Sequence, residues 1–325
     1  MMFTASRLSE MVNRHIGDLK FARSPQGLYD PVAYVLSMGG KRLRPVLMLM
    51  AYNLYRDRVD DIWGPVTGIE VYHNHTLLHD DVMDHADLRR GKPTVHKVWS
   101  ENAAILSGDA MLILAYRYMM QCPVYCAKEV LDLFALTSLE ICEGQQLDME
   151  FEQRNDVSEA EYLEMIRLKT SVLLAASLKI GALLGEAPAK DADALYDFGM
   201  NMGVAFQLKD DLLDVYGDPA VFGKNLGGDI LCNKKTYLLI KAAELADAGQ
   251  KARLETWLGA DSCDPQEKIA AVTDLYNCIG VKEWCEQKMA DYTARARQGL
   301  AEVGVEPARK QELEKLLERL MYRQA

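Results

Sequence analysis

The sequence has little of what disulfide-bonded, zinc-binding or membrane-spanning proteins need. Its seven cysteines form no CxxC pair, so neither a zinc site nor a disulfide framework is indicated, and we expect a reducing, cytoplasmic setting. No stretch approaches the roughly 20 apolar residues of a membrane span, and polar residues between Ser9 and Arg14 interrupt the first apolar positions. We therefore expect no membrane insertion and no signal peptide. With 10 prolines and 22 glycines in 325 residues, collagen-like repeats are excluded.

Positive charge is also scarce. The chain has 37 Lys and Arg against 48 Asp and Glu, a formal charge of −11. Electrostatic binding of nucleic acid or of an anionic membrane is therefore excluded as the main activity. If the ligand is an anion, its site must reverse the sign of the charge locally.

The third absence is the period-two alternation of β-strands. Apolar residues instead recur at helical spacing, as at Leu8, Met11, Val12 and Leu19, so we predict helices and no strands. Ser158 and Glu161 form a capping box. Prolines mark further helix boundaries: Pro25, Pro31, Pro45, Pro65, Pro123, Pro188, Pro265 and Pro307. Long helices are predicted over 65–84, 125–152, 159–184 and 192–216. No linker divides the chain, so we predict one all-α domain over residues 1–325, a bundle around a cavity.

Two DDxxD clusters stand 130 residues apart, Asp80, Asp81 and Asp84 in the first and Asp210, Asp211 and Asp214 in the second. On a helix, residues i and i+4 share one face, so each cluster presents a pair of carboxylates. A single such cluster is as well explained by a solvated helix face. Both clusters, however, lie in apolar sequence, where unpaired carboxylates are costly and need cations. Magnesium suits them, since it is held by one or two carboxylates together with substrate phosphates.

Basic residues gather in three short segments: Lys41, Arg42 and Arg44 in GGKRLRP, Arg89 and Arg90 after the first cluster, and Lys224, Lys234 and Lys235 in the glycine-rich stretch 217–235. Arg and Lys beside glycine can bind phosphate groups. For GGKRLRP, a helix C-terminus with basic residues answering its dipole is an equal alternative. The stretch 217–235 has four glycines and is predicted to be a mobile loop over a site. Acidic, basic and apolar segments together favour a substrate that is a diphosphate with a hydrocarbon tail.

These residues resemble the trans-isoprenyl diphosphate synthases of the polyprenyl synthetase family. GGKRLRP, LLHDDVMDHADLRRGKPTVH, GQQLD, Lys169-Thr170, FQLKDDLLD and GKNLGGDI occur in the family's order between about residues 25 and 240. The resemblance implies an all-α isoprenoid-synthase fold in a homodimer. It also implies that isopentenyl diphosphate is joined head-to-tail to an allylic diphosphate, with three magnesium ions in each active site.

The resemblance also implies roles for individual residues. The metal ligands are Asp80, Asp81, Asp84, Asp210 and Asp214. Arg89, Lys169, Thr170, Gln207, Lys224 and Lys234 would serve the allylic diphosphate, with Thr170 and Gln207 lining the position of the carbocation. Lys41, Arg44, His73 and Arg90 would bind isopentenyl diphosphate. Gln145 and Asp148 would support this set. Taken alone, Lys169 is more typical of the surface of an amphipathic helix than of a ligand. His73 and His79, taken alone, are more typical of packed helix residues.

In the family, the residue five positions before the first aspartate often forms the floor of the cavity for the growing tail. Here it is His75, followed by Thr76. Histidine is neither large nor small, so it leaves product length between fifteen and twenty carbons, with a longer polyprenyl product as an alternative.

Three other functions compete with chain elongation. A terpene cyclase uses one allylic diphosphate and needs no second anion pocket, so GGKRLRP argues against it. A non-catalytic partner subunit has no reason to keep both carboxylate clusters. A plain helical scaffold explains neither GGKRLRP nor the two clusters.

Overall fold

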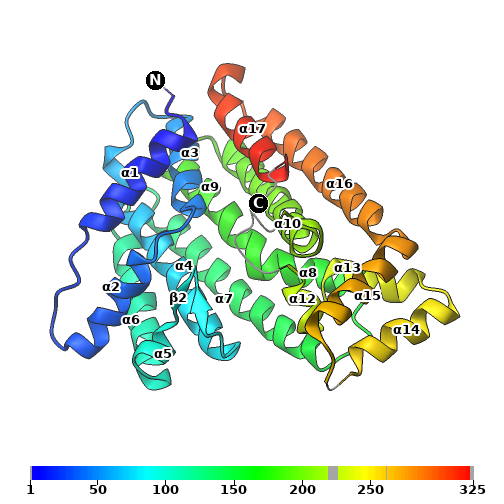
Figure 1. The fold of residues 1–325 in the computed structure, drawn as a ribbon. Helices are drawn as coiled ribbons and strands as arrows, with labels where there is room; N and C mark the ends of the chain where they lie inside the picture. The colour runs from blue at the N-terminus through cyan, green and yellow to red at the C-terminus, as the bar shows by residue number, and fades with distance from the viewer. Residues whose placement is uncertain (1, 219–225, 261, 323–325) are drawn as a thin grey trace. The chain divides into compact units, whose positions relative to one another are not determined.

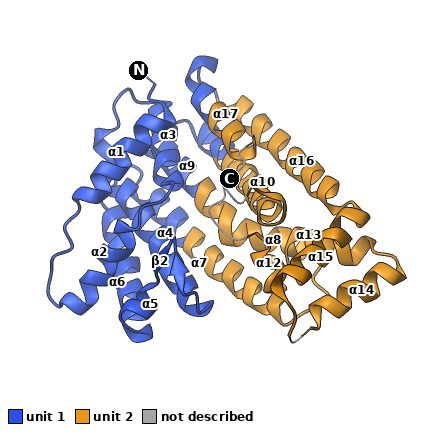
Figure 2. Ribbon diagram, viewed as in Figure 1, with its two compact units in different colours: residues 1–135, 176–195, 304–313 blue, residues 136–175, 196–303, 314–325 orange. Residues whose placement is uncertain are grey.

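The computed structural model describes residues 2–218, 226–260 and 262–322. Helices make up most of these ranges, and the strands among them form one short hairpin (Figure 1). The all-α prediction is confirmed. The chain divides into two compact units, unit 1 with residues 1–135, 176–195 and 304–313, and unit 2 with residues 136–175, 196–303 and 314–325 (Figure 2).

Unit 1 holds the N-terminal elements. These are α1 (Ala5–Asp18), α2 (Gln26–Ser37), α3 (Leu43–Asn53), the 3-10 turn η1 (Asp60–Ile62), α4 (Trp63–Met83), β1 (Leu88–Arg89), β2 (Lys92–Pro93), α5 (Val95–Val98) and α6 (Glu101–Met119). Helix α4 packs along α6, and glycines let the two approach closely. A Cβ atom on Gly68 of α4 would lie 3.0 Å from the Ala115 carbonyl oxygen of α6.

Unit 2 holds most of the C-terminal elements. These are α8 (Glu159–Ile166), the π-helical segment η2 (Arg167–Ser171), α12 (Gly228–Leu231), α13 (Tyr237–Leu245), α14 (Ala248–Leu258), α15 (Pro265–Ile279) and α16 (Val281–Glu302). Four helices contribute residues to both units: α7 (Ala127–Glu152), α9 (Val172–Leu184), α10 (Ala189–Tyr216) and α17 (Pro307–Tyr322).

Helix prediction succeeds for the long elements. Those predicted over 65–84, 125–152 and 192–216 appear as α4, α7 and α10 with ends shifted by up to three residues, and the capping box of Ser158 and Glu161 opens α8. Pro265 and Pro307 stand first in α15 and α17, where the missing N–H costs nothing. Pro31 is an exception, because it lies inside α2 and does not mark its end.

The helix predicted over 159–184 is interrupted. Its middle turn is η2, where the Val172 N–H donates to the Arg167 carbonyl, one residue wider than in an α-helix. Glycines of two other helices pack against this turn. A Cβ on Gly144 of α7 would collide with the Lys169 backbone, and one on Gly203 of α10 would lie 2.6 Å from the Ser171 Cα. The π-turn η2 therefore lies where α7 and α10 approach its backbone closely.

The prediction of no strands is wrong at one place. The segment from Leu88 to Pro93 forms an antiparallel two-residue ladder. Its turn is Arg90-Gly91, and both residues have positive φ, 53° and 74°, as in the two-residue turns that suit hairpins. Arginine is uncommon at such a position, so the sequence carries only the glycine as a signal.

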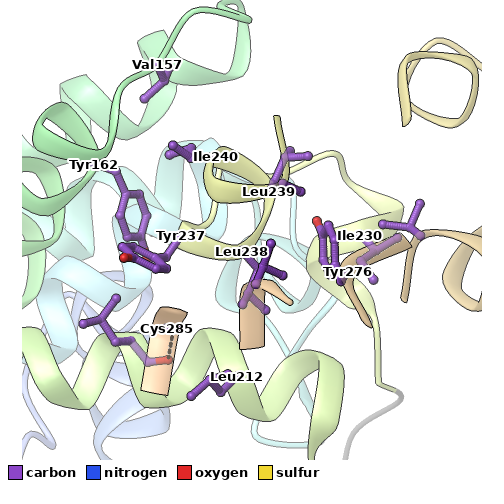
Figure 3. Packing of buried hydrophobic residues seen from close by; sticks show 14 of the residues in the cluster. Val157, Tyr162, Leu212, Ile230, Tyr237, Leu238, Leu239, Ile240, Tyr276 and Cys285 are labelled. Carbon is purple, nitrogen blue, oxygen red and sulfur yellow. Dashed lines mark hydrogen bonds between the residues drawn. The ribbon is translucent and has the colours of Figure 1, made fainter. Parts of the chain in front are cut away.

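The core of unit 2 lies where α8, α10, α12, α13, α15 and α16 meet (Figure 3). Tyr162 of α8 and Tyr237 of α13 are almost fully buried in it, with ring centroids 6.4 Å apart. This core lies behind the second carboxylate cluster, since Leu208 and Leu212 of α10 belong to it.

The predicted loop over 217–235 is partly helical, because Gly228–Leu231 forms α12. Residues 219–225 lie outside the described ranges. Among the described helices, none has the length and apolar character needed to cross a bilayer.

Candidate functional site

The first carboxylate cluster lies at the C-terminal end of α4. Asp80 and Asp81 occupy the last turn, and Asp84 caps it, its N–H donating to the Asp80 carbonyl at 2.8 Å. The Asp81 side chain is 8% exposed and that of Asp80 20%, whereas Asp84 is exposed. The expectation of a buried cluster is thus correct for Asp81 and wrong for Asp84, because the buried part of α4 ends one turn earlier.

Arg89 of β1 contacts this cluster directly. Its Nε donates to Asp81 Oδ1 at 2.7 Å, and its Nη2 lies 3.4 Å from Asp80 Oδ2. Burial raises the pKa of Asp81, and the Arg89 guanidinium opposes that shift. Arg89, which the sequence assigns to the allylic diphosphate, is therefore held at the aspartates by a charge-assisted hydrogen bond.

The loop after the first cluster is built around Thr94. This residue is fully buried, and its hydroxyl donates to the Ala86 carbonyl at 2.7 Å while its N–H donates to the Asp87 carbonyl at 3.1 Å. These hydrogen bonds join the two ends of the segment that contains the hairpin, and so they help to fix the backbone of Arg89 and Arg90.

Arg90 lies on the two glycines of GGKRLRP. It donates to the Gly39 carbonyl, and a Cβ on Gly40 would lie 2.6 Å from its guanidinium carbon. Gly39 and Gly40 have φ of 76° and 131°, which favour glycine. The structure thus brings Arg90 to the residues directly before Lys41, as expected for one anion pocket; Lys41 itself is exposed.

The two alternatives for GGKRLRP apply to different residues. Arg42 is buried, donates to the Leu36 carbonyl at the end of α2 at 2.6 Å, and pairs with Glu70 at 2.5 Å. Arg42 therefore donates a hydrogen bond to a carbonyl at the C-terminal end of α2. Arg44 instead places its Nη1 3.1 Å from His73 Nε2.

His73 is a neutral imidazole in this arrangement. Burial and then the nearby Arg44 hold its pKa well below the usual value. Because Arg44 donates to Nε2, the imidazole proton is on Nδ1. Burial also lowers the pKa of Arg44, to about 10, so the guanidinium stays charged near neutral pH. Arg44, His73 and Arg90 thus form a cationic group with donors for an anion.

The second cluster lies on α10, and its three aspartates have different surroundings. Asp210 and Asp214 are half-buried, while Asp211 is 3% exposed. Asp211 accepts hydrogen bonds from the Tyr162 hydroxyl and from the Tyr237 N–H at 3.1 Å. Burial raises the pKa of Asp211 to about 7.

Asp214 holds the start of α12. Its Oδ2 accepts from the Asp229 N–H at 3.0 Å and its carbonyl from the Gly227 N–H at 2.7 Å. Asp229 is therefore a further carboxylate near the second cluster. It lies within the motif GKNLGGDI, but the sequence did not identify it as a site residue. The only signal available was its place after a pair of glycines.

Lys169 and Thr170 lie in η2. The Lys169 ammonium donates to Asp148 of α7 at 2.6 Å, and the Thr170 hydroxyl donates to Gln207 of α10 at 3.3 Å. A π-turn often marks a functional segment. The structure therefore brings Asp148 to Lys169, and Gln207 to Thr170.

Two other lysines were assigned to the allylic diphosphate. Lys234 is exposed between α12 and α13, and its N–H donates to the Asp229 carbonyl at 2.9 Å. Lys224 lies outside the described residues.

His75 and Thr76, assigned to product length, lie on α4 one turn before the first cluster. The His75 ring is 5.7 Å from that of Tyr72 and 4.6 Å from that of His79. Burial lowers the pKa of His75 to about 4, and its buried Nδ1 has no hydrogen-bond partner among the described residues. Thr76 donates to the His73 carbonyl. His79 lies 3.1 Å from the Ile105 carbonyl, as a packed helix residue.

The donor set of both clusters fits magnesium. Each offers carboxylate oxygens at i and i+4 of a helix, with cationic side chains nearby. Within the described residues, no three carboxylate, imidazole or thiol groups are gathered closely enough to hold a metal by themselves. Magnesium keeps several waters and needs only one or two carboxylates when a substrate phosphate completes its shell.

The chain is similar to known proteins over most of its length. Residues 25–276 match the polyprenyl synthetase family model. The chain is 40% identical over 273 residues to a geranylgeranyl diphosphate synthase of Methanosarcina mazei, covering 83% of this chain and 82% of that protein. A crystal structure of a geranylgeranyl pyrophosphate synthase is similar over all of both chains, with 42% identity and a TM-score of 0.94.

A second similar structure contains ligands. It is a geranylgeranyl pyrophosphate synthase from Corynebacterium glutamicum complexed with isoprenyl diphosphate and magnesium, with 26% identity, a TM-score of 0.88, and coverage of 99% of this chain and 100% of that one. The family match over most of the chain, and the identity to relatives along nearly their whole length, establish that this chain belongs to the polyprenyl synthetase family.

Proposed function

We propose that this chain is a magnesium-dependent trans-prenyltransferase that joins isopentenyl diphosphate head-to-tail to an allylic diphosphate. One observation carries the proposal. Each unit has a helix with a carboxylate pair at i and i+4 and a buried aspartate between them that is bonded to other side chains, Asp81 to Arg89 and Asp211 to Tyr162. The pairs Asp80 with Asp84 and Asp210 with Asp214 are the proposed metal ligands, and Asp81 supports the first pair through Arg89.

Magnesium, when bound, neutralises the charge that develops on the leaving diphosphate. The side chains Arg89, Lys169 and Lys234, with Lys224, would hold that diphosphate while its allylic C–O bond breaks and the electron pair leaves on oxygen. Thr170 and Gln207 would offer oxygen atoms near the cation. Because the Thr170 hydroxyl donates to Gln207, the Thr170 oxygen keeps lone pairs free to face a positive charge.

Arg44, His73 and Arg90, with Lys41, would bind the diphosphate of isopentenyl diphosphate. The double bond of that substrate attacks the allylic carbon, a new C–C bond forms, and a proton is lost to the departing diphosphate. No protein base is required. The neutral His73 adds no charge, but its Nδ1–H can donate to a phosphate oxygen while Nε2 orients Arg44.

Three finer features belong to the same proposal: three magnesium ions per site, a homodimer and a cytoplasmic setting. The relative that contains magnesium supports the choice of metal. Exposed apolar residues at seven-residue intervals along α6 and at its C-cap support the dimer, since Leu106 is 60%, Ile113 63% and Met120 64% exposed. All seven cysteines are free, which supports a reducing compartment.

We propose a product of fifteen or twenty carbons, with His75 as the floor of the tail cavity. Two relatives with 40% and 42% identity to this chain are named geranylgeranyl diphosphate or pyrophosphate synthases, which supports a product of twenty carbons. Replacing His75 with alanine should lengthen the product by at least one five-carbon unit. Unchanged product length would remove His75 from this role.

The test of the proposed function is product analysis after incubation with isopentenyl diphosphate, magnesium and dimethylallyl, geranyl or farnesyl diphosphate in turn. Elongated prenyl diphosphates are expected. Cyclic hydrocarbons formed from the allylic substrate alone would indicate a cyclase, a long polyprenyl product would reject the short-chain assignment, and no turnover with any primer would indicate a non-catalytic subunit.

A further inference from the structure

Asp211, the middle aspartate of the second cluster, does not share the face of its neighbours. On a helix it is rotated by about 100° from Asp210, and it is 3% exposed, in contact with the core of unit 2. Tyr162 and Tyr237, two of its hydrogen-bond partners, lie side by side in that core (Figure 3).

Both carboxylate oxygens of Asp211 are occupied by donors of this chain. Oδ2 accepts from the Tyr162 hydroxyl and from the Tyr237 N–H at 3.1 Å, and Oδ1 is 3.4 Å from Gln207 Nε2. Tyr237 is the first residue of α13, so the carboxylate also lies at the positive end of that helix. Asp211 is also more deeply buried than Asp210 and Asp214.

Each partner of Asp211 is close in sequence to a proposed ligand of the allylic diphosphate, or is hydrogen-bonded to one. Tyr162 is on α8, which continues through η2 and its Lys169. Tyr237 follows Lys234 by three residues, and Asp211 and Lys234 line the same small cavity of about 10 Å³. Gln207 bonds Thr170.

We propose that Asp211 is a positioning residue and not a magnesium ligand, and that its bond to the Tyr162 hydroxyl fixes η2 and the start of α13 relative to the metal-binding face of α10. This inference rests on the proposed function. The Asp211 carboxylate connects α10 with α8 and α13. If one donor is lost, a buried carboxylate oxygen lacks a hydrogen bond, and the contacts among these three helices are weakened together.

The test replaces Tyr162 with phenylalanine, which removes only the hydroxyl. Tyr216→Phe is the matched control, because Tyr216 lies on α10 against the same core and its buried hydroxyl has no hydrogen-bond partner among the described residues. Two quantities are measured: the KM of each substrate, and the affinity for inorganic pyrophosphate with magnesium by calorimetry.

For Tyr162→Phe we expect the KM of the allylic substrate to rise about tenfold and pyrophosphate affinity to fall about tenfold, as for the loss of one hydrogen bond to a charged group. The KM of isopentenyl diphosphate should stay within about twofold, because its proposed ligands lie in unit 1. A general loss of structure would change both KM values. Tyr216→Phe should behave as the unchanged protein.

Two aspartate variants separate positioning from metal binding. Asp210→Asn should lower kcat by about three orders of magnitude. Asp211→Asn keeps one acceptor oxygen but loses the charge, so it should resemble Tyr162→Phe, and the double variant should be little worse than either single one because both weaken the same bond. Loss of turnover in Asp211→Asn equal to that in Asp210→Asn would overturn the inference. So would equal pyrophosphate affinity in Tyr162→Phe and Tyr216→Phe. If the unchanged protein binds pyrophosphate but elongates no substrate, the proposed function fails, and the pyrophosphate comparison still decides the role of Asp211.

Discussion

At the scale of single residues, neighbouring aspartates of one motif have different burial and different partners. From the sequence alone, replacing Asp81 or Asp210 is expected to relieve repulsion between carboxylates. The structure changes that expectation for Asp81, because its carboxylate forms a nearly buried ion pair with Arg89. Burial and partner, more than motif position, decide what each carboxylate does.

The pair Asp80→Asn and Asp81→Asn tests this distinction. Asp81→Asn should lower the free energy of unfolding by about 2 kcal/mol, since it weakens a charge-assisted hydrogen bond. Asp80→Asn should change stability much less and lower kcat by about three orders of magnitude. Chemical denaturation and steady-state kinetics provide both values. Equal stability of the two variants would contradict the structural role of Asp81.

His75 predicts a dependence of stability on pH. Its pKa is lowered to about 4 in the folded chain, against 6.5 in the unfolded one. The folded state therefore binds the proton less readily, so its stability is complete above about pH 6.5 and falls by about 2 to 3 kcal/mol as the pH drops to about 4. His75→Gln should remove this part of the slope in denaturation curves recorded between those pH values. An unchanged slope would show that His75 titrates normally.

At the scale of elements, the π-turn η2 depends on glycines in other helices. Gly144→Ala should force the Lys169 backbone to move, lower the free energy of unfolding by about 1 to 3 kcal/mol, and raise the KM of the allylic substrate. Gly17→Ala is the control, because a Cβ there meets no atom within 4 Å and alanine is the better helix residue. A Gly144→Ala variant with normal stability and KM would show that η2 tolerates a wider separation.

These elements also show what the sequence could reveal. Apolar periodicity and the capping residue Ser158 are local signals, and they predicted α4, α7, α10 and the start of α8. The turn η2 could not be predicted, since Gly144 and Gly203 are distant in sequence. The hairpin required a positive φ at Arg90, which no local preference indicates.

The same limit applies to the candidate site. Spacing was enough to find both carboxylate clusters, whereas Lys169 and Thr170 were indicated only by the family resemblance. The sequence alone could not tell that Arg42 pairs with Glu70 whereas Arg44 contacts His73, because these partners are brought together only by folding. Asp229 was missed for the same reason, because only folding brings it to Asp214.

At the scale of the whole molecule, the exposed apolar residues of α6 predict self-association. Ile113→Glu should convert the proposed dimer to a monomer in sedimentation experiments, because a charge would be buried in the interface. Leu245→Glu is the control, since Leu245 is also exposed, at 39%, but lies at the end of α13. A dimer that persists in Ile113→Glu would place the contact elsewhere.

We propose that both carboxylate pairs act on one diphosphate. A crystal structure of the protein with Mn2+ and inorganic pyrophosphate tests it most directly, because the anomalous signal locates each metal ion. We predict metal ions on Asp80 with Asp84 and on Asp210 with Asp214, all of them bound to the same pyrophosphate. Metal ions at only one cluster, or at two clusters with no pyrophosphate shared between them, would contradict the account.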